Sequence, residues 1–272
     1  MSLNARSRLT VPEVKARKGA EKLVCLTAYT APVAKLLDPH VDILLVGDTV
    51  GMVLHGMSST VGVTLDMMVM HGQAVMRGSS QALVVVDMPF GSYERSPKAA
   101  HKSAVRILQE TGCQAVKVES GKGIADTIAF LVDRGVPVMG HVGLRPQAVN
   151  IDGGFKAKGR LEDERDRVFA EARAAVDAGA FAIVVEGVAR DLADEITRDV
   201  SIPTIGIGAS PQCDGQILVT DDMLGLFDWT PKFVRRYANL REAISRAAVS
   251  YAADVRSGHF PNAAEIYTLK AT

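Results

Sequence analysis

Short apolar runs rich in β-branched residues recur along the chain, and polar segments separate them. Most runs are apolar at consecutive positions rather than at alternate ones, which is typical of strands covered on both faces of a parallel sheet. We therefore expect eight strands, of which the eighth has the weakest pattern. They cover Leu23–Tyr29, Asp42–Asp48, Ala82–Met88, Ala115–Glu119, Val136–His141, Phe181–Gly187, Ile202–Gly208 and Gln216–Thr220.

The segments between these runs have helical patterns. Ser96 and Pro97 are typical first residues of a helix and Gly112 is a typical last one, so they bound one predicted helix. A second helical pattern covers 163–179, and a long amphipathic stretch covers 231–258. Strands and helices therefore alternate along the chain.

Eight strands that alternate with helices in about 250 residues predict an α/β fold, the (β/α)8 or TIM barrel. We expect a single barrel domain over residues 1–272, with a short N-terminal helix within 9–19 that closes the barrel floor. An open doubly wound sheet is the alternative. Its glycine-rich fingerprint fails, because Gly206 and Gly208 are followed by Pro211 where the third glycine belongs.

Composition narrows the classes of function. The 31 basic side chains equal the 31 acidic ones, which argues against a nucleic-acid partner or a basic membrane-binding surface. No apolar stretch approaches the roughly 20 residues of a membrane span, and the first residues lack the apolar core of a signal peptide. Three scattered cysteines argue against disulfides and cysteine-based metal sites. We expect a cytoplasmic protein that acts on small molecules.

Ionisable residues gather at the carboxyl ends of the predicted strands, whose interiors carry almost none. In a barrel these ends converge on one rim, where the catalytic groups are placed. A buried carboxylate is costly unless cations or hydrogen bonds compensate it, so a series of them favours a functional site. The rim residues are Asp48, Asp87, Lys117, Glu119, His141 and Glu186.

The residue types at this rim limit its chemistry. Asp48, Asp87 and Glu119 are hard oxygen donors without a cysteine beside them, so a bound cation would be of the magnesium type. Such a site suits a chelating 2-oxo acid, because the metal acts as a Lewis acid and makes the carbon next to the keto group easier to deprotonate. Among the other rim residues, Glu186 is a candidate base. Lys117 and His141 can stabilise oxyanions or hold the substrate carboxylate.

A series of segments resembles the ketopantoate hydroxymethyltransferase family, in the family's order, from about residue 9 to about residue 261. A string of this length is far more specific than any single motif. The segments are "ILLVGDTVGMVLHG", "VTLDMMVMHGQAVMRG", "VVVDMPFGSY", "AVKVESG", "PVMGHVGLRPQ", "GGFKAKGR" and "IPTIGIGASPQCDGQILVTDDMLGL".

The resemblance implies a reaction and its requirements. A hydroxymethyl group would pass from the co-substrate 5,10-methylenetetrahydrofolate to 2-oxoisovalerate (3-methyl-2-oxobutanoate), giving 2-dehydropantoate on the route to pantothenate and coenzyme A. The resemblance also implies a (β/α)8 barrel, one Mg2+ per subunit, a homodecamer and a cytoplasmic location. The reaction would proceed through an enolate that Mg2+ stabilises.

Carried over by motif, the resemblance implies that Asp48 and Asp87 bind the metal, with Glu119 close by, directly or through water. Glu186 would be the base, and Thr49 would lie at the substrate carboxylate. The implied substrate-binding residues are Asp48, Thr49, Asp87, Lys117 and His141. A few positions depart from the family pattern, which more often has serine at Thr49, glycine at Ser120 and Ser210, and proline at Ala189. These departures leave every reacting group in place.

Two other hypotheses stay open. One is a Mg2+-dependent C–C or C–P lyase or mutase of the isocitrate lyase and phosphoenolpyruvate mutase type. Those enzymes carry a reactive cysteine on a flexible loop, and the candidate here is Cys213, late in the chain. The other is a non-catalytic barrel, against which the acidic rim argues. We expect the methionine-rich helix 64–78 to serve packing or an interface, and 143–160 to be either a lid or an ordinary surface loop.

Overall fold

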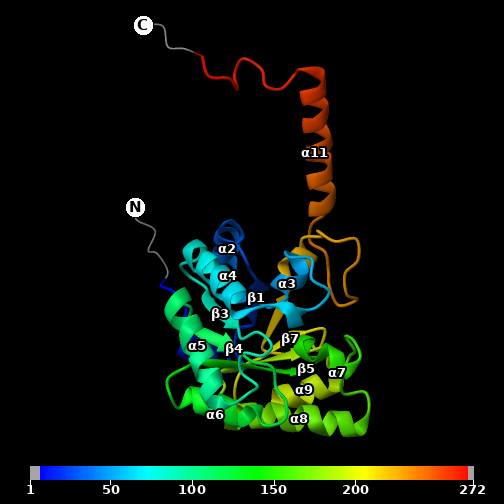
Figure 1. Cartoon of the computed structure of the whole chain (residues 1–272). Coiled ribbons are helices and arrows are strands. Elements are labelled where there is room, and N and C mark those ends of the chain that lie inside the picture. The colour runs from blue at the N-terminus through cyan, green and yellow to red at the C-terminus, as the bar shows by residue number, and fades with distance from the viewer. Residues whose placement is uncertain (1–6, 269–272) are drawn as a thin grey trace. The chain divides into compact units, whose positions relative to one another are not determined.

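A computed structural model describes residues 7–268. Eight parallel strands form a closed barrel in chain order, and β8 pairs with β1 to complete it (Figure 1). The predicted (β/α)8 barrel is confirmed. The strands are Leu23–Thr27 (β1), Ile43–Val46 (β2), Leu83–Asp87 (β3), Ala115–Lys117 (β4), Val138–Gly143 (β5), Ala182–Glu186 (β6), Thr204–Ile207 (β7) and Gly215–Leu218 (β8).

Helices connect the strands and lie outside the sheet (Figure 1). The expected helix signals hold for α5, because the side chain of Ser96 accepts a hydrogen bond from the Ala99 amide and Gly112 ends the helix in the left-handed region. The α-helices of the barrel are Val11–Lys15 (α1), Ala31–Leu37 (α2), Val50–Val53 (α3), Leu65–Gly78 (α4), Pro97–Thr111 (α5), Ile124–Val132 (α6), Val149–Asp152 (α7), Glu162–Asp177 (α8) and Arg190–Asp199 (α9). The 3-10 turns are Asp38–His40 (η1), Thr60–Gly62 (η2) and Pro146–Ala148 (η3).

Alternate strand residues divide the apolar core into two parts. Leu44, Val84 and their equivalents face the helical layer, whereas Ile43, Leu83 and their equivalents fill the barrel interior. Val14 of α1 is fully buried and belongs to the interior cluster. The N-terminal helix therefore closes the barrel floor, as predicted.

A buried carboxylate ties this floor to the strands. Asp214, just before β8, accepts hydrogen bonds from the Gly19 amide at 2.9 Å and from the Thr204 amide at 2.9 Å, and pairs with Lys18 at 3.0 Å. The cation and the amides compensate the cost of burying the charge. The floor is thus stabilised at the end of the barrel opposite to the rim.

A second compact unit follows the barrel strands. The first unit ends at Val219, and residues 220–272 form the second. The second unit contains α10, Thr220–Met223, and α11, Leu240–Ser257, in which no side chain is buried. That the chain folds as one domain stays a prediction. Among the described residues, no helix combines the length and the apolar character needed to cross a membrane.

The contact between α2 and α4 yields a stability prediction. Gly78 ends α4 against the first residue of α2, and an added Cβ would collide with the Ala31 carbonyl oxygen and lie 2.9 Å from its carbon. Gly78→Ala should therefore lower the free energy of unfolding by about 1–3 kcal/mol, despite the better helix propensity of alanine. Gly62→Ala is the control, because its Cβ would meet only Met57 Sδ at 3.5 Å. Urea unfolding of both variants tests this, and a Gly78→Ala protein as stable as the control would contradict it.

Candidate active site

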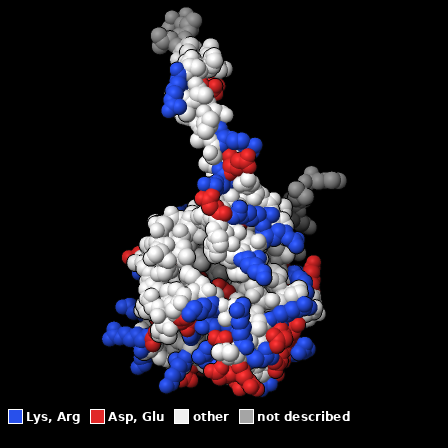
Figure 2. All heavy atoms as spheres, turned by 90° about the vertical axis from the view of Figure 1, so that its right-hand side faces the viewer, with Lys and Arg blue, Asp and Glu red and all other residues white. Residues whose placement is uncertain are grey.

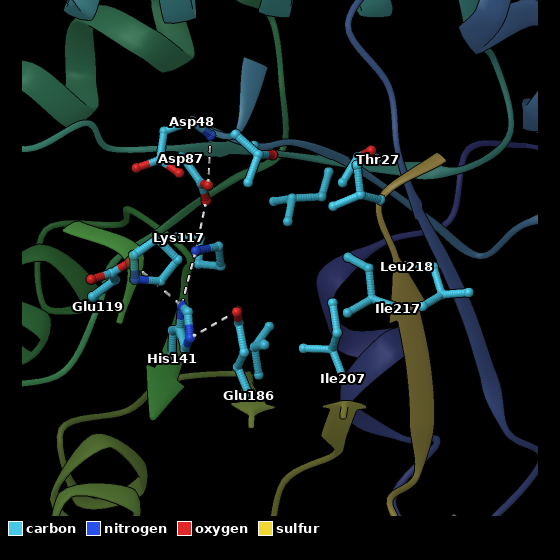
Figure 3. A pocket seen from close by; sticks show the side chains of 16 residues that line it. Thr27, Asp48, Asp87, Lys117, Glu119, His141, Glu186, Ile207, Ile217 and Leu218 are labelled. Atoms are coloured by element: carbon cyan, nitrogen blue, oxygen red, sulfur yellow. Dashed lines mark hydrogen bonds and ion pairs between the residues drawn. The ribbon is translucent and has the colours of Figure 1, made fainter. Parts of the chain in front are cut away.

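Strands β2 to β6 place ionisable side chains around the mouth of the barrel (Figure 3). Asp87, Lys117 and Glu186 are the last residues of β3, β4 and β6, and His141 lies within β5. The parallel register puts Asp87 directly beside Lys117. Asp48 follows β2, and its amide donates to Asp87 Oδ2 at 3.0 Å.

The structure brings all seven predicted site residues to one pocket. They are Asp48, Thr49, Asp87, Lys117, Glu119, His141 and Glu186. The opposite wall of the pocket is mostly apolar (Figure 3), and its labelled residues are Thr27, Ile207, Ile217 and Leu218. Leu45 and Val184 also line the pocket. The pocket therefore has a charged side and an apolar side.

Three carboxyl groups on the charged side are almost inaccessible to solvent. Burial raises the pKa of Asp48, Asp87 and Glu119, and the charge of Asp87 raises that of Asp48 further. Lys117 opposes these shifts, with its ammonium 3.0 Å from Asp87 Oδ1. One lysine faces three carboxylates, so a single positive charge does not balance their negative charges when all three are ionised. A bound cation would compensate the remainder.

Lys117 stays protonated in this setting. Burial alone would lower its pKa, but Asp87, Asp48 and Glu119 outweigh burial and hold the pKa above its ordinary value. Its ammonium also lies 3.3 Å from Nδ1 of His141. Since an ammonium only donates, this nitrogen of the imidazole is an acceptor.

The tautomer of His141 follows from that contact. Burial and the charge of Lys117 hold the pKa of His141 well below its usual range, so the ring is neutral. With Nδ1 accepting from Lys117, the single ring proton is on Nε2, which lies 3.4 Å from Glu186 Oε2. His141 therefore has no free nitrogen lone pair on the side of Glu186, and its Nε2 is buried without a hydrogen-bond partner among the described residues.

Glu186 is the carboxyl group that best reaches the open pocket. Its side chain is 20% exposed, against 5% for that of Glu119. Burial raises its pKa to about 7; Asp48 and Asp87 add to the rise and Lys117 opposes it. A carboxylate with such a pKa accepts a proton more readily than an ordinary glutamate.

The hydroxyl of Thr49 has a fixed partner. Tyr29, which follows β1, places its hydroxyl 2.7 Å from Thr49 Oγ1. Thr49 itself lines the pocket beside Asp48. The added methyl group, relative to serine, leaves this hydroxyl contact intact.

The acidic residues do not form a group of three ligands. Within residues 7–268, no three His, Cys, Asp or Glu side chains are arranged to hold a metal ion. Both oxygens of Glu119 instead accept from the backbone amide of Gln147, at 3.3 and 3.2 Å. Asp48 and Asp87 thus lie together as a pair, and Glu119 is held beside them.

Sequence reasoning missed two polar residues of this site, Gln147 and Tyr93. Both are buried, and the hydroxyl of Tyr93 donates to Gln147 Oε1 at 2.7 Å. Gln147 also contacts Asp48. Neither residue follows a strand directly and neither is charged at neutral pH, so the pattern of strand ends gave no signal for them.

The segment 143–160 lies along the end of β6. Its Lys158 amide donates to the Gly187 carbonyl at 2.7 Å, and the Lys158 ammonium pairs with Asp152 at 3.2 Å. The first contact attaches the segment to the residue that follows Glu186, and the second lies within the segment. That it moves as a lid stays a prediction.

Solved structures share this architecture at low sequence identity. A 2,3-dimethylmalate lyase of the PEP mutase/isocitrate lyase superfamily has a TM-score of 0.60 and 16% identity, covering 95% of this chain and 92% of that one. A phosphonopyruvate hydrolase solved with oxalate and Mg2+ has a TM-score of 0.59 and 14% identity, covering 96% and 93%. At such identities the likeness establishes the fold alone.

Sequence relatives are much closer. The 3-methyl-2-oxobutanoate hydroxymethyltransferase of Hyphomonas neptunium is 70% identical over 264 residues, 97% of this chain and 96% of the relative. That of Phenylobacterium zucineum is 68% identical with the same coverage. The family model described as ketopantoate hydroxymethyltransferase matches residues 8–263. The chain therefore belongs to the ketopantoate hydroxymethyltransferase family.

Proposed function

We propose that the chain transfers a hydroxymethyl group from 5,10-methylenetetrahydrofolate to 3-methyl-2-oxobutanoate, giving 2-dehydropantoate for pantothenate and coenzyme A synthesis. Membership of the family gives the reaction class. The observation that carries the proposal is the two-sided pocket, in which a charged wall faces an apolar one (Figure 3). A branched 2-oxo acid has the same division, with a charged oxo-acid end and an apolar isopropyl group.

The charged wall fits a hard divalent cation. Asp87 Oδ1 is buried and, apart from its ion pair with Lys117, has no hydrogen-bond partner among the described residues. Asp48 and Asp87 would hold one Mg2+ per subunit, and Glu119 would reach it through water. When bound, the cation would polarise the keto oxygen of the substrate and so acidify its C3 proton.

Glu186 is the residue that we assign as the base. It reaches the open pocket, and its raised pKa matches it to proton transfer near neutral pH. His141 cannot take the proton as placed, since Nδ1 accepts from Lys117 and Nε2 carries the ring hydrogen. Its Nε2 has no hydrogen-bond partner among the described residues, so it would join the Lys117 ammonium and the Thr49 hydroxyl in holding the oxygen atoms of the substrate.

The lyase or mutase alternative finds no support in the position of the cysteines. Cys213, its only loop candidate, is fully buried, and Cys25 and Cys113 are buried too. Burial raises the pKa of Cys25 and of Cys113, so neither thiol is activated. The free thiols accord with the cytoplasmic location that we propose.

Two surfaces support the proposed homodecamer. Val24 points outward from β1 and is 48% exposed, although outward side chains of a barrel strand are ordinarily covered. Helix α11 carries exposed apolar side chains, among them Ile244 and Val255. On the face of the barrel seen in Figure 2, positive and negative side chains are interspersed. Burial against other copies would remove the apolar surface from water.

The first prediction concerns proton transfer. With Mg2+ and no folate, the protein should exchange the C3 proton of 3-methyl-2-oxobutanoate for solvent deuterium, as NMR can follow. Glu186→Gln should slow the exchange by roughly two to four orders of magnitude, the usual contribution of a general base. His141→Asn is the comparison and should retain more of the exchange. Normal exchange in Glu186→Gln together with loss in His141→Asn would show that the base is assigned to the wrong strand. Full turnover with methylenetetrahydrofolate tests the transfer itself.

The second prediction concerns pH. Glu186 must be ionised to accept a proton, and burial raises its pKa to about 7. Exchange should therefore increase with pH and level off above a midpoint at or somewhat below this value, since a bound cation favours the ionised form. The rate of exchange against pH, measured at saturating Mg2+, checks this. A profile that is already flat from about pH 5 upward would point to a base with an ordinary carboxyl pKa.

The third prediction concerns assembly. Light scattering at micromolar concentration should give a mass several times that of the 29.0 kDa chain, and that of ten copies if the decamer is right. Ile244→Glu should reduce the mass if α11 lies in an interface, because it would place a charge in an apolar contact. Wild-type protein that elutes with the mass of one chain would contradict the proposal.

A further inference from the structure

Gln147 contacts the ends of the three strands that supply Asp48, Asp87 and Glu119. Its Nε2 donates to Asp48 Oδ2 at 2.7 Å, after β2, and to the Met88 carbonyl at 3.0 Å, directly after Asp87. Its backbone amide donates to both oxygens of Glu119, after β4. One residue on the turn after β5 therefore touches three neighbouring strand ends.

The hydrogen bonds of this residue fix the orientation of its amide. The Met88 carbonyl only accepts, so Nε2 must face it and Oε1 must face Tyr93. Tyr93 Oη in turn accepts from the Glu119 amide at 3.3 Å, which leaves its proton for Gln147. These groups form a chain of hydrogen bonds in which each donates to the next. The Glu119 amide donates to Tyr93, Tyr93 to Gln147, and Gln147 to Asp48. Both hydrogens of Nε2 and the oxygen of the side chain are thus used.

The local backbone explains why Gln147 can also hold Glu119. Pro146 begins the 3-10 turn η3, and Gln147 is the next residue. Amides in the first turn of a helix have no partner within the helix. The Gln147 amide is therefore free to donate to Glu119, and a side-chain substitution at this position leaves that contact available.

A neutral donor is the side chain that this position requires. A lysine in place of Gln147 would add a second ammonium that competes with a cation, whereas a glutamate would add a fourth carboxylate to three that already repel one another. An amide orients Asp48 Oδ2 without changing the charge of the site. Gln147 and Tyr93 are 6% and 2% exposed, so water does not readily replace these bonds.

We propose that Gln147 is the positioning residue of the cation site, which orients Asp48 through its side chain and Glu119 through its backbone. The inference rests on the proposed function to the extent that the acidic pair binds a divalent cation. In this role Gln147 would act through Asp48 and Glu119 and not by binding the substrate or the cation. Partners that orient metal ligands in this way typically contribute 10- to 100-fold to metal affinity.

The test measures metal affinity apart from turnover. Chelator-treated protein is titrated with Mn2+ and the free ion is followed by electron paramagnetic resonance. Gln147→Met keeps a side chain of similar length but removes the donor, and it should raise the Kd for Mn2+ by about 10- to 100-fold. Excess Mg2+ should restore most of the turnover of this variant, because the ligands themselves are intact. General structural damage would not be reversed by metal.

Gln114→Met is the matched control. The Gln114 side chain also makes two bonds to backbone, with the Val84 amide and the Gly112 carbonyl, but it lies before β4 at the other end of the barrel. Its loss should affect stability and leave the Kd for Mn2+ unchanged. Asp87→Ala provides the reference for a site without one of its ligands.

The outcomes separate this inference from the proposed function. Wild-type affinity for Mn2+ in a folded Gln147→Met protein would overturn the role of Gln147 alone. Absence of Mn2+ binding by the wild type would overturn the cation site together with that role. Should Gln147→Met fail to fold, Tyr93→Phe decides, because it removes the hydrogen bond to Gln147 Oε1, one of the bonds that orient the amide. It should raise the Kd by roughly 2- to 10-fold, and an unchanged Kd would then count against the proposal.

Discussion

A buried excess of negative charge governs the site. Asp48, Asp87 and Glu119 share the charged wall with one ammonium, and burial disfavours their ionised forms. The same imbalance keeps Lys117 protonated, and burial together with the charge of this lysine keeps His141 neutral by lowering its pKa. Each protonation state at the rim therefore depends on its neighbours, so a substitution that changes the charge at one position alters the chemistry at the others.

Much of this site could be predicted from sequence, and the reason is geometric. In a parallel barrel every strand points the same way, so residues that follow apolar runs in sequence must meet at one rim in space. Asp87, Lys117 and Glu186 are the last residues of their strands, where the apolar pattern breaks off. The N-terminal floor helix was predicted from its place in the chain, since a short segment with a helical pattern precedes the first strand.

Other features lay outside what a linear pattern can give. The role of Gln147 depends on a turn that brings this residue back over three strand ends. The local sequence contains no pattern that predicts this position of the turn. The contact between Lys117 and His141 that settles the tautomer depends on side-chain placement, not on spacing. Asp48 and Glu119 were expected as strand ends, yet they lie beyond the last paired residues of β2 and β4. That offset places Asp48 within reach of the Gln147 side chain and Glu119 within reach of the Gln147 backbone amide.

The two walls of the pocket come from different parts of the chain. The charged wall is built by β2 to β6, whereas Thr27, Ile207 and Ile217 of the apolar wall belong to β1, β7 and β8 (Figure 3). During synthesis, the ribosome releases all the ionisable groups of the rim before it releases the strands that complete the opposite wall. A nascent chain that ends at β6 would thus lack Ile207 and Ile217, which line the opposite side of the pocket. The complete pocket therefore depends on the pairing of the last strand with the first, because Ile217 and Leu218 of its apolar wall belong to β8.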